Sequence, residues 1–503
     1  MPPWRPWSPG CGVIVAEHRC PLVRRYFRLA LRMPDAPAVL DSDGRMIRSR
    51  SDLAGAAAEA GAFLGHHLPH GRVALLSLPN GPDMVAVFLA LRAAGATVAL
   101  ADAAAPEQEL MAAAEAVNAA VIVSRAERLS TVPVEPLGIG IAVAATGRDG
   151  RSPVPGADLF KLTSGSSGAP RAVAVSARQL VADTCQIVHT MGIAPEDTTL
   201  AAIPLTHSYG IGSCLILHLL LGTPLAFPGS TLPAALGDTL AAARVRHFPA
   251  VPAMVRALAA LDRLPGFPDL KLCLTAGAPL RPADAAAFHD ATGIKVHIFY
   301  GSSECGGITF DRSTVPALMA GQVGSPLARV RIEIVDSGGN PLPAGISGRV
   351  RVHSPAVGLG STGGGCEDDG ILGRTFLTGD VGVLDEEGRL TLTGRVGELI
   401  NVAGKKVHPA EVRQVLEEMP GVHGTVVAGV PDPHRGQMVG AIVATTPGGS
   451  VTISRLLAHC RGRMAPHKIP RRIVLVSELP VNDRGKVSRE TIEALLSRLP
   501  QGG

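Results

Sequence analysis

The sequence Leu162-Thr-Ser-Gly-Ser-Ser-Gly-Ala-Pro-Arg-Ala-Val173 contains an unbroken run of Gly, Ser and Thr residues, Thr163–Gly168. Largely apolar segments flank this run, Asp158–Leu162 before it and Arg171–Val175 after it, so we expect the run to be a loop joining two strands. Glycines let backbone N–H groups turn toward one point, and Ser and Thr hydroxyls add donors. Such a loop can hold phosphate oxygens, although a flexible hairpin loop would have the same composition.

Two common phosphate-binding motifs do not fit this chain. The P-loop needs two well-separated glycines, a Lys and then a helix, whereas Gly165 and Gly168 are close together and the basic residue is Arg171. A literal G-x-G-x-x-G occurs at Gly358–Gly363, but it is followed by further Gly and Asp residues and opens no helical pattern. Because the dinucleotide fingerprint requires a strand, a turn and a helix, we interpret Gly358–Gly363 as a surface loop.

The composition favours a large globular protein and argues against several classes of function. A chain of 503 residues that is 46% hydrophobic can bury large cores, and at about 150 residues per domain it would form roughly three folding units. The net charge of +4 is small and is not clustered, so nucleic-acid binding is not indicated. The eight cysteines form no C-x-x-C pattern, which is typical of reduced thiols and not of disulfides or a zinc site.

Neither an export signal nor a membrane span is expected. The longest apolar stretches, Met84–Ala101 and Ile211–Phe227, contain Arg92 and His218 as well as Gly or Pro. A span needs about 20 consecutive apolar residues with few or no charges, so these stretches are interpreted as buried helix–strand pairs. We therefore expect a cytoplasmic protein. The sequence does not indicate its oligomeric state.

Helical and strand patterns alternate through the first 300 residues, which is typical of parallel α/β layers. From Gly324 short strands lie between Gly and Asp turns, which indicates a β-rich subdomain, and a small α/β unit follows from about Gly397. The predicted fold class is therefore α/β. The main predicted helices are Ser51–Leu68 with Ser51 as candidate N-cap, Pro82–Ala94, Ala177–Thr190 with Ser176 as N-cap, Pro282–Thr292 and Pro409–Glu418. The main predicted strands are Val73–Leu78, Thr97–Ala101, Thr199–Ile203, Lys295–Phe299, Gly348–His353 and Arg472–Val476.

Several polar motifs follow predicted strands. His207 lies in Pro204–Gly210 at a strand exit, and Tyr300–Glu304 come directly after the strand Lys295–Phe299. The carboxyl ends of parallel strands are the usual ligand-binding edge of an open α/β sheet. Taken one at a time, each motif could equally be a turn, a cap or a surface residue. The remaining motifs are Leu274–Pro279, Thr378–Asp380, Gly394–Arg395 and Gly485–Lys486.

In this order the motifs resemble those of the adenylate-forming superfamily, which includes acyl-CoA synthetases, luciferases and peptide-synthetase adenylation domains. Residues 163–171 (TSGSSGAPR) resemble that family's phosphate loop T-S-G-[ST]-[ST]-G-x-P-K, residues 204–210 (PLTHSYG) its P-L-x-H-x-x-G, and residues 480–490 (PVNDRGKVSRE) its terminal P-x-x-x-x-G-K-x-x-R. The resemblance covers about residues 35–495. It implies a large N-terminal AMP-binding domain over residues 1–395 and a small, mobile α+β C-terminal domain over residues 396–503.

The resemblance implies an ATP-dependent acid–thiol ligase. Family members convert a carboxylate and ATP to an acyl-adenylate and pyrophosphate, and then transfer the acyl group to a thiol. The implied cofactors are ATP, Mg²⁺ and CoA, with the phosphopantetheine of a separate acyl carrier protein as the alternative thiol. An inactive ligase-like binding protein is a further alternative. Residues after Glu304 are small, and no Asp lies where an amino-acid-activating enzyme would bind an ammonium group, so a fatty or aryl acid is expected.

The resemblance also implies roles for individual residues. Lys486 would bridge the carboxylate and the α-phosphate, Glu304 would hold Mg²⁺, and His207 would lie at the acid site. Tyr300 would stack on adenine and Asp380 would accept from both ribose hydroxyls. The remaining candidates are Thr163, Ser164, Gly165, Ser166, Ser167, Gly168 and Arg171 for the β- and γ-phosphates, Ser303 for the α-phosphate, Gly277, Ala278 and Pro279 at the edge of adenine, Gly301 and Ser302 for the nucleotide in general, and Arg395 for ribose and phosphate.

Two positions depart from the family pattern. Arg171 stands where Lys is usual, so the positive charge is kept although its geometry differs. Gly397 stands at the hinge about which the C-terminal domain is expected to rotate between the two half-reactions, where Asp or Lys is more usual. Glycine has the widest backbone freedom, which would loosen that rotation. After rotation, Val402–Lys405 would line a tunnel for the thiol.

Overall fold

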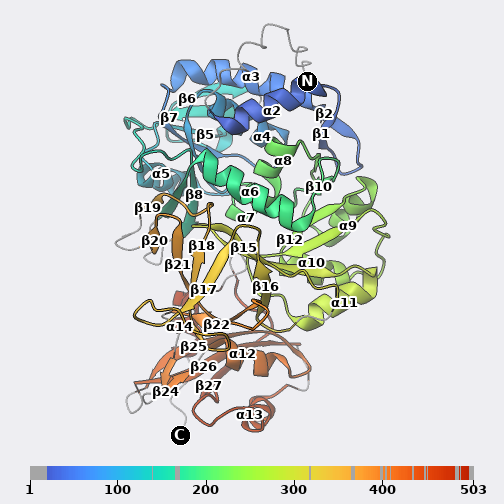
Figure 1. Cartoon of the computed structure of the whole chain (residues 1–503), viewed down its shortest axis with the longest axis vertical. Helices are drawn as coiled ribbons and strands as arrows, with labels where there is room; N and C mark the ends of the chain where they lie inside the picture. The colour runs from blue at the N-terminus through green and yellow to red at the C-terminus, as the bar shows by residue number, and fades with distance from the viewer. Residues whose placement is uncertain are drawn as a thin grey trace. The chain divides into compact units, whose positions relative to one another are not determined.

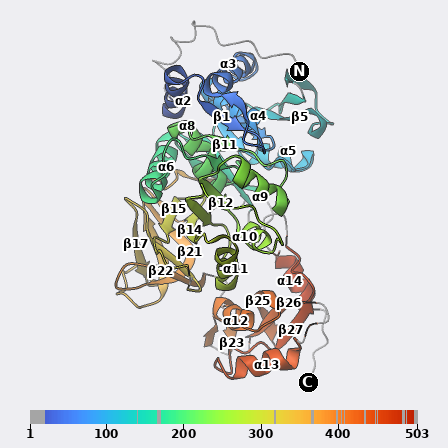
Figure 2. The same ribbon diagram turned by 90° about the vertical axis from the view of Figure 1, so that its right-hand side faces the viewer.

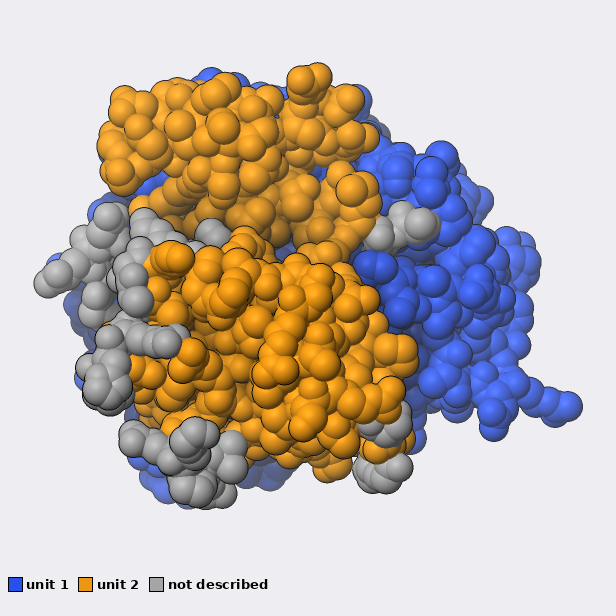
Figure 3. Space-filling view, turned by 90° about the horizontal axis from the view of Figure 1, so that it is seen from below, with its two compact units in different colours: residues 1–318, 323–332, 352–377 blue, residues 319–322, 333–351, 378–503 orange. Residues whose placement is uncertain are grey.

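The computed structural model describes the chain from Cys20 to Ser497, except for residues 139, 165–169, 317–318, 364–368, 397–399, 403–404, 408, 433–435, 447–448, 450, 482–486 and 488. The chain divides into two compact units (Figure 3). Unit 1 comprises residues 1–318, 323–332 and 352–377, and unit 2 comprises residues 319–322, 333–351 and 378–503. The domain boundary after residue 395 stays a prediction.

An eight-stranded sheet in unit 1 carries the two strands that flank the Gly/Ser/Thr run (Figure 1). Its four central strands are parallel, and antiparallel strands complete both edges. Strands β3 and β4 are buried along their whole length, as expected for parallel strands covered on both faces. The strand order is β19 (Gly360–Gly363), β9 (Pro170–Val175), β8 (Leu159–Ser164), β4 (Thr97–Leu100), β3 (Val73–Ser77), β5 (Val121–Arg125), β7 (Ile141–Ala145) and β6 (Val134–Gly138).

A second sheet in unit 1 is also parallel at its centre, which confirms the prediction of parallel α/β layers. Its last parallel strand, β14, turns back into the antiparallel strands β15 and β16. The strand order within unit 1 is β16 (Gln322–Pro326), β15 (Gly306–Phe310), β14 (Val296–Ser302), β13 (Leu272–Thr275), β12 (His247–Ala250), β10 (Thr199–Leu200), β11 (Leu225–Ala226), β1 (Pro37–Leu40) and β2 (Met46–Ser49).

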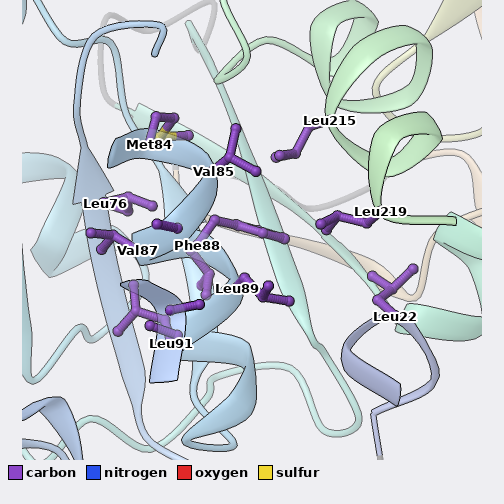
Figure 4. Packing of buried hydrophobic residues seen from close by; sticks show 14 of the residues in the cluster. Leu22, Leu76, Met84, Val85, Val87, Phe88, Leu89, Leu91, Leu215 and Leu219 are labelled. Carbon is purple, nitrogen blue, oxygen red and sulfur yellow. The ribbon is translucent and has the colours of Figure 1, made fainter. Parts of the chain in front are cut away.

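The core of unit 1 is built around helix α4 (Pro82–Ala93), which is buried from Met84 to Arg92 (Figure 4). A helix that is apolar all round must be buried on every side. Figure 4 shows Phe88 among Leu22 of α2 (Pro21–Arg32), Leu215 of η3 (Ile211–Ile216) and Leu219 of α8 (Leu217–Leu221). The helices of unit 1 are α2 (Pro21–Arg32), α3 (Arg50–His67), α4, α5 (Glu107–Ala116), the 3-10 turn η2 (Ala126–Arg128), α6 (Ala177–Met191), α7 (Ser208–Gly210), the π-helix η3 (Ile211–Ile216), α8 (Leu217–Leu221), α9 (Pro233–Ala242), α10 (Pro252–Ala259) and α11 (Pro282–Thr292).

The charge inside the apolar stretch Met84–Ala101 is neutralised within the protein. Arg92 is buried, forms an ion pair with Asp158 and also donates to the carbonyl of Ala96. Buried charges are tolerated when they are paired. Within the described ranges, the structure contains no helix with the length and apolarity needed to cross a bilayer.

Helix α6 begins where the sequence predicts. Ser176 is its N-cap, and the Ser176 hydroxyl and the Gln179 side chain bond to each other's backbone N–H groups in a capping box. Replacing Ser176 with Ala removes one of these two bonds and is expected to lower the free energy of unfolding by about 0.5–2 kcal/mol. Denaturant unfolding monitored by circular dichroism would measure this loss. A Ser152→Ala variant, in a loop that caps no helix, serves as the control.

Three predictions about local structure are wrong. The N-cap of α3 is Ser49 and not Ser51, because Ser49 and Asp52 form the capping box there. Residues Gly360–Gly363 are strand β19 and not a loop, because their backbone pairs antiparallel with β9. Strand β14 extends through Tyr300 to Ser302, because β15 folds back on it as a hairpin. Its parallel pairing with β13 nevertheless ends at Ile298, so Tyr300–Ser302 lie beyond the parallel part of the sheet.

Unit 2 ends in a small α+β unit, as predicted (Figure 2). Along β26 the side chains of Ala441 and Val443 join the core with α12 and α13, whereas Ile442 between them packs with Leu496 of α14. This alternation places helices on both faces of the sheet. The elements of this small unit are β23 (Ile400–Val402), β24 (Lys405–Val407), α12 (Pro409–Glu417), β25 (Val422–Asp432), β26 (Gly436–Thr445), α13 (Ile453–Arg461), β27 (Arg472–Val476) and α14 (Arg489–Ser497). The strands that lie wholly or partly in the earlier segments of unit 2 are β17 (Arg331–Val335), β18 (Gly348–His353), β21 (Thr375–Leu384) and β22 (Leu390–Arg395). Strand β20 (Ile371–Leu372) belongs to unit 1 and pairs with the first residues of β21.

Candidate functional site

The Gly/Ser/Thr run joins two antiparallel strands, as predicted, but its first two residues, Thr163 and Ser164, belong to strand β8 and not to the loop. Thr163 pairs with Arg171 and Ser164 with Pro170 across the β8–β9 hairpin, and the Thr163 hydroxyl donates to the Arg171 carbonyl over 3.3 Å. The hairpin therefore fixes the start of the run, Thr163 and Ser164, beside the residues that follow it, Pro170 and Arg171. Four of the candidate phosphate-binding residues lie outside the described residues, namely Gly165, Ser166, Ser167 and Gly168.

Arg171 brings two motifs together that are far apart in the sequence. Its Nη1 lies 3.5 Å from Oε1 of Glu304, and its Nη2 donates to the Ser361 hydroxyl over 3.1 Å. Its Nε is buried and has no hydrogen-bond partner among the described residues. A buried donor without a partner is costly, so a ligand oxygen beside Arg171 would stabilise the site. Glu304 is largely buried, with 15% of its side chain exposed.

The turn that carries Glu304 contacts the PLTHSYG motif. The Ser303 and Ser208 hydroxyls lie 2.7 Å apart, within hydrogen-bond distance. The Ser302 hydroxyl accepts from the backbone N–H of Cys305 over 3.3 Å and so closes the turn. Burial raises the pKa of the Cys305 thiol to about 12, which keeps this thiol neutral. Two predicted site motifs, around His207 and around Glu304, therefore meet in the folded chain.

His207 directly precedes the short helix α7. It was predicted to lie at the exit of a strand, and this prediction is wrong because β10 ends at Leu200. Its carbonyl accepts from the Ile211 N–H over 2.8 Å, and its side chain is partly exposed. Tyr209 packs against Phe299 with 5.8 Å between ring centroids and donates to the Leu274 carbonyl over 3.3 Å. Burial raises the pKa of Tyr209 far above its ordinary value, so its phenol is a neutral hydrogen-bond donor.

The residues proposed to surround adenine lie at the ends of two neighbouring strands. Thr275 of β13 pairs with Ile298 of β14, so Gly277–Pro279 follow β13 and Tyr300 lies in β14 just beyond its parallel pairing with β13. Gly277 has φ +87°, a conformation that side-chain-bearing residues rarely adopt, and a Cβ added there would contact nothing within 4 Å. Gly277–Pro279 are exposed and Tyr300 is partly exposed. This geometry leaves an open surface on which a flat ring can lie.

Asp380 and Arg395 lie opposite each other in the β21–β22 hairpin of unit 2. Arg395 Nε lies 2.8 Å from Asp380 Oδ1, and the Asp380 N–H donates to the Thr378 hydroxyl over 3.0 Å. Asp380 was expected at a strand end, and this prediction is wrong because β22 pairs with β21 well past it. Lys486 and Gly397 lie outside the described residues.

The small residues after Glu304 are required for packing of the chain on itself. A Cβ on Gly306 would lie 2.3 Å from Oδ1 of Asp183, and Gly306 has φ +70°. A Cβ on Gly307 would lie 2.5 Å from Cδ1 of Leu327. The smallness of these residues is thus explained without a substrate, and it is not evidence for room in an acid pocket.

Sequence reasoning missed four polar residues of this region: Lys161, Asp183, Ser208 and Ser361. Ser361 belongs to the segment interpreted as a loop, and only its pairing with β9 brings it to Arg171. Lys161 could have been recognised from the sequence, because a Lys in an apolar strand of a chain with few lysines is unusual. Asp183 could not have been recognised in this way, since an Asp in a helical pattern is commonly a solvent-exposed residue.

The chain matches the family model "AMP-binding enzyme" over residues 27–361 and the model "AMP-binding enzyme C-terminal domain" over residues 411–486. It is 29% identical to a feruloyl-CoA synthase of an Amycolatopsis species, covering 83% of this chain and 87% of that protein. It is 28% identical to the uncharacterized acyl--CoA ligase YhfT of Bacillus subtilis, covering 86% of this chain and 89% of that protein. Among solved structures, ATP-bound MatB from Rhodopseudomonas palustris has the same fold, with a TM-score of 0.82 at 23% identity over 94% of this chain and 98% of that chain. Since the first family model alone matches more than half of the sequence, the protein belongs to the AMP-binding enzyme family.

Proposed function

We propose that this protein is an AMP-forming acid–CoA ligase that activates a fatty or aryl carboxylic acid. The single observation that carries the proposal is the pairing of Arg171 with Glu304 beside the phosphate-loop hairpin. It places a group suited to phosphate next to a group suited to a divalent cation, as a nucleotide triphosphate requires. Membership of the AMP-binding family supports the same reaction.

The protein groups around Glu304 fit a Mg²⁺ ion that arrives with ATP. Mg²⁺ is usually bound through one or two carboxylates together with substrate phosphates, and Glu304 offers one carboxylate beside the phosphate loop. In the described part of the chain, no three or more His, Cys, Asp or Glu side chains form a metal-binding group, so a cage of protein ligands is not built there. When bound, Mg²⁺ supplies charge neutralisation of the phosphates.

The β- and γ-phosphates would be held by the Gly/Ser/Thr run and by Arg171. Thr163–Gly168 would donate from backbone and hydroxyl groups, and Arg171 would donate from the guanidinium whose Nε has no protein partner in the described chain. Arg171 pairs with Glu304 in this structure. When ATP binds, its phosphate oxygens would pair with Arg171 instead, and the Glu304 carboxylate would then be free to bind the cation. Ser303 would contact the α-phosphate, and its hydroxyl is already oriented by Ser208.

For the adenosine, we propose roles for residues of each unit taken by itself. Tyr300 would stack on the base with Gly277–Pro279 at its edge, and Gly301 and Ser302 continue the same strand. The Asp380 carboxylate has two oxygens that can accept from both ribose hydroxyls, and Arg395 would hold that carboxylate in place.

Adenylation joins two anions, which is where Lys486 would act. A carboxylate oxygen attacks the α-phosphorus, the bond from that phosphorus to the pyrophosphate oxygen breaks, and pyrophosphate leaves with its electron pair. The Lys486 ammonium would lie between the carboxylate and the α-phosphate and offset their repulsion. We place the acid beside His207 and Tyr209, because Ser208 between them contacts Ser303.

Thioester formation follows at the same acyl carbon. The thiolate sulfur of CoA attacks the carbonyl, and AMP leaves with the electrons of the acyl–phosphate bond. A rotation of the residues after the hinge at Gly397 would remove Lys486 and bring the β23–β24 hairpin, in which Val402 pairs with Lys405, to the thiol. The names of the matched relatives favour CoA over a carrier-bound phosphopantetheine as the acceptor.

The function is tested by ATP–pyrophosphate exchange over a panel of fatty, aryl and amino acids, followed by thioester formation with CoA or with a phosphopantetheinylated carrier protein. We expect exchange with an aryl or fatty acid, and acyl-CoA as the product. Exchange driven best by a free amino acid would contradict the proposed substrate class. Transfer to the carrier and not to CoA would contradict the proposed acceptor, and a lack of exchange with every acid would favour the inactive binding protein.

Replacing Arg171 with Ala is expected to raise the KM for ATP in pyrophosphate exchange by roughly 10–100-fold, because one charge-assisted hydrogen bond contributes about 1.5–3 kcal/mol. Arg171→Lys keeps the charge and should recover most of this loss. Ser361→Ala, which removes only the bond to Nη2, is the matched control and should change the KM little. An Arg171→Ala variant with the wild-type KM would exclude Arg171 from phosphate binding.

A further inference from the structure

We propose that Lys161 and Asp183 are positioning residues that fix the turn carrying Glu304. The proposal rests on the proposed function of Glu304 toward MgATP. Lys161 lies in β8 and Asp183 in α6, and both contact the backbone of that turn. The Lys161 ammonium donates to the Ser303 carbonyl over 3.4 Å, and Oδ1 of Asp183 accepts from the Gly307 N–H over 2.8 Å. The two contacts therefore lie on either side of Glu304 in the sequence.

Both side chains are buried charges of opposite sign. Lys161 is 3% exposed and Asp183 is 5% exposed. Lys and Asp are rarely buried to this extent unless they are compensated, because each loses its hydration. Burial raises the pKa of Asp183, and the positive charge of Lys161 and the Gly307 N–H oppose that rise. Each charge thus stabilises the other inside the protein.

The local backbone is shaped to admit Asp183. Gly306 has φ +70°, and a Cβ at this position would overlap the Asp183 carboxylate, with 2.3 Å to Oδ1 and 2.4 Å to Cγ. Only a glycine lets the turn lie directly on the carboxylate in this conformation. On its other side Asp183 borders the π-helix η3, where a Cβ added to Gly212 would lie 3.2 Å from Oδ2. The carboxylate is therefore packed between this helical segment and the turn.

Lys161 also connects this turn to the phosphate loop. It lies two residues before Thr163 on the strand that enters the Gly/Ser/Thr run. On the other strand of the same hairpin, Arg171 pairs with Glu304 itself. The β8–β9 hairpin thus contacts the turn at the Ser303 backbone and at the Glu304 side chain. Moving either contact would displace the carboxylate relative to the loop that receives the phosphates.

The test uses charge-neutral double variants, because removing one of two buried, opposite charges leaves an uncompensated charge that destabilises the fold. Lys161→Met with Asp183→Asn removes the Ser303 contact, while the Asn oxygen can still accept from Gly307. Lys161→Met with Asp183→Leu removes both contacts. The readout is ATP affinity by titration calorimetry with and without Mg²⁺, and Glu304→Gln is the reference for loss of the cation contact. Thermal melting monitors the fold.

We expect Mg²⁺ to strengthen ATP binding to the wild-type protein, and the strengthening to fall by about 10–100-fold in the double variants, more in the Leu variant than in the Asn variant. ATP affinity without Mg²⁺ should change little. The control is Lys295→Met with Asp311→Asn, which removes a largely buried Lys–Asp ion pair of 2.8 Å at the opposite end of β14. This control should lower the melting temperature and leave the effect of Mg²⁺ unchanged.

Three negative results would each overturn a proposal. If Glu304→Gln loses the effect of Mg²⁺ while both folded double variants keep it, Lys161 and Asp183 are structural residues only and the inference is wrong. If Glu304→Gln and the wild-type protein respond equally to Mg²⁺, the proposed function of Glu304 is wrong, and the inference that rests on it is wrong too. A double variant that behaves like the Lys295 and Asp311 control, with a lower melting temperature alone, also overturns the inference.

Discussion

Replacing Lys486 with Ala is expected to slow ATP–pyrophosphate exchange by roughly 10²–10³-fold, or about 2.7–4 kcal/mol in the transition state. The charge of Lys486 acts when the carboxylate and the α-phosphate approach each other. It has no such role when the acyl group moves from AMP to CoA. The conversion of a supplied acyl-adenylate and CoA to acyl-CoA should therefore remain nearly unchanged, and rapid-quench measurement of each half-reaction would check both expectations.

Two further variants sharpen this prediction. Lys486→Arg should restore little activity, because a planar guanidinium cannot replace a compact ammonium between two anions. Lys468→Ala is the matched control, since Lys468 lies in the same C-terminal region and forms an ion pair with Glu411. It should affect neither half-reaction. Equal slowing of both half-reactions by Lys486→Ala would indicate misfolding of the small domain and would remove the support for its rotation.

Replacing Asp380 with Ala is expected to weaken ATP binding by about 100-fold or more, because two hydrogen bonds from the ribose hydroxyls to a charged acceptor are lost at about 1.5–3 kcal/mol each. Turnover should fall with it. Calorimetry with ATP measures the binding loss directly. Unchanged ATP affinity would exclude Asp380 as the ribose acceptor even if turnover fell.

The hairpin that carries Asp380 also supplies its control. Asp385 lies in the same β21–β22 hairpin and pairs with Arg389 over 2.7 Å, as Asp380 pairs with Arg395 over 2.8 Å. Asp385→Ala therefore removes a comparable ion pair from the same hairpin without removing the proposed ribose acceptor. ATP affinity should be unchanged in this variant. A loss in both variants would mean that the hairpin and not the carboxylate is responsible.

Elements with clear start and stop residues could be predicted from the sequence. Helix α11 begins at Pro282 and ends before Gly293, and its bounds were predicted correctly. Strand β12 (His247–Ala250) was missed, because it contains Pro249 and a proline argues against a central strand. Strand β14 was predicted too short, because its last residues are glycine and serine and are ordered by the hairpin with β15.

The candidate site could be predicted as a set of motifs but not as a set of contacts. The order of the motifs identified Arg171, Glu304 and Ser303 as candidates. In the structure Arg171 contacts Glu304, and Ser303 contacts Ser208. The Lys161 and Asp183 contacts could not be predicted. They depend on how α6 packs under the turn, and no local pattern in the sequence encodes that tertiary distance.

Strand β19 has a consequence for how the protein avoids self-association. It covers β9, which would otherwise present the unpaired backbone groups of the phosphate-loop hairpin at the border of the eight-stranded sheet. An open border of this kind can recruit a strand from another chain and start aggregation. The border is instead formed by β19, which is only four residues long and begins and ends with a glycine of positive φ. A short strand of this shape offers a poor template to another molecule, so the β8–β9 hairpin is protected from aggregation by its neighbour.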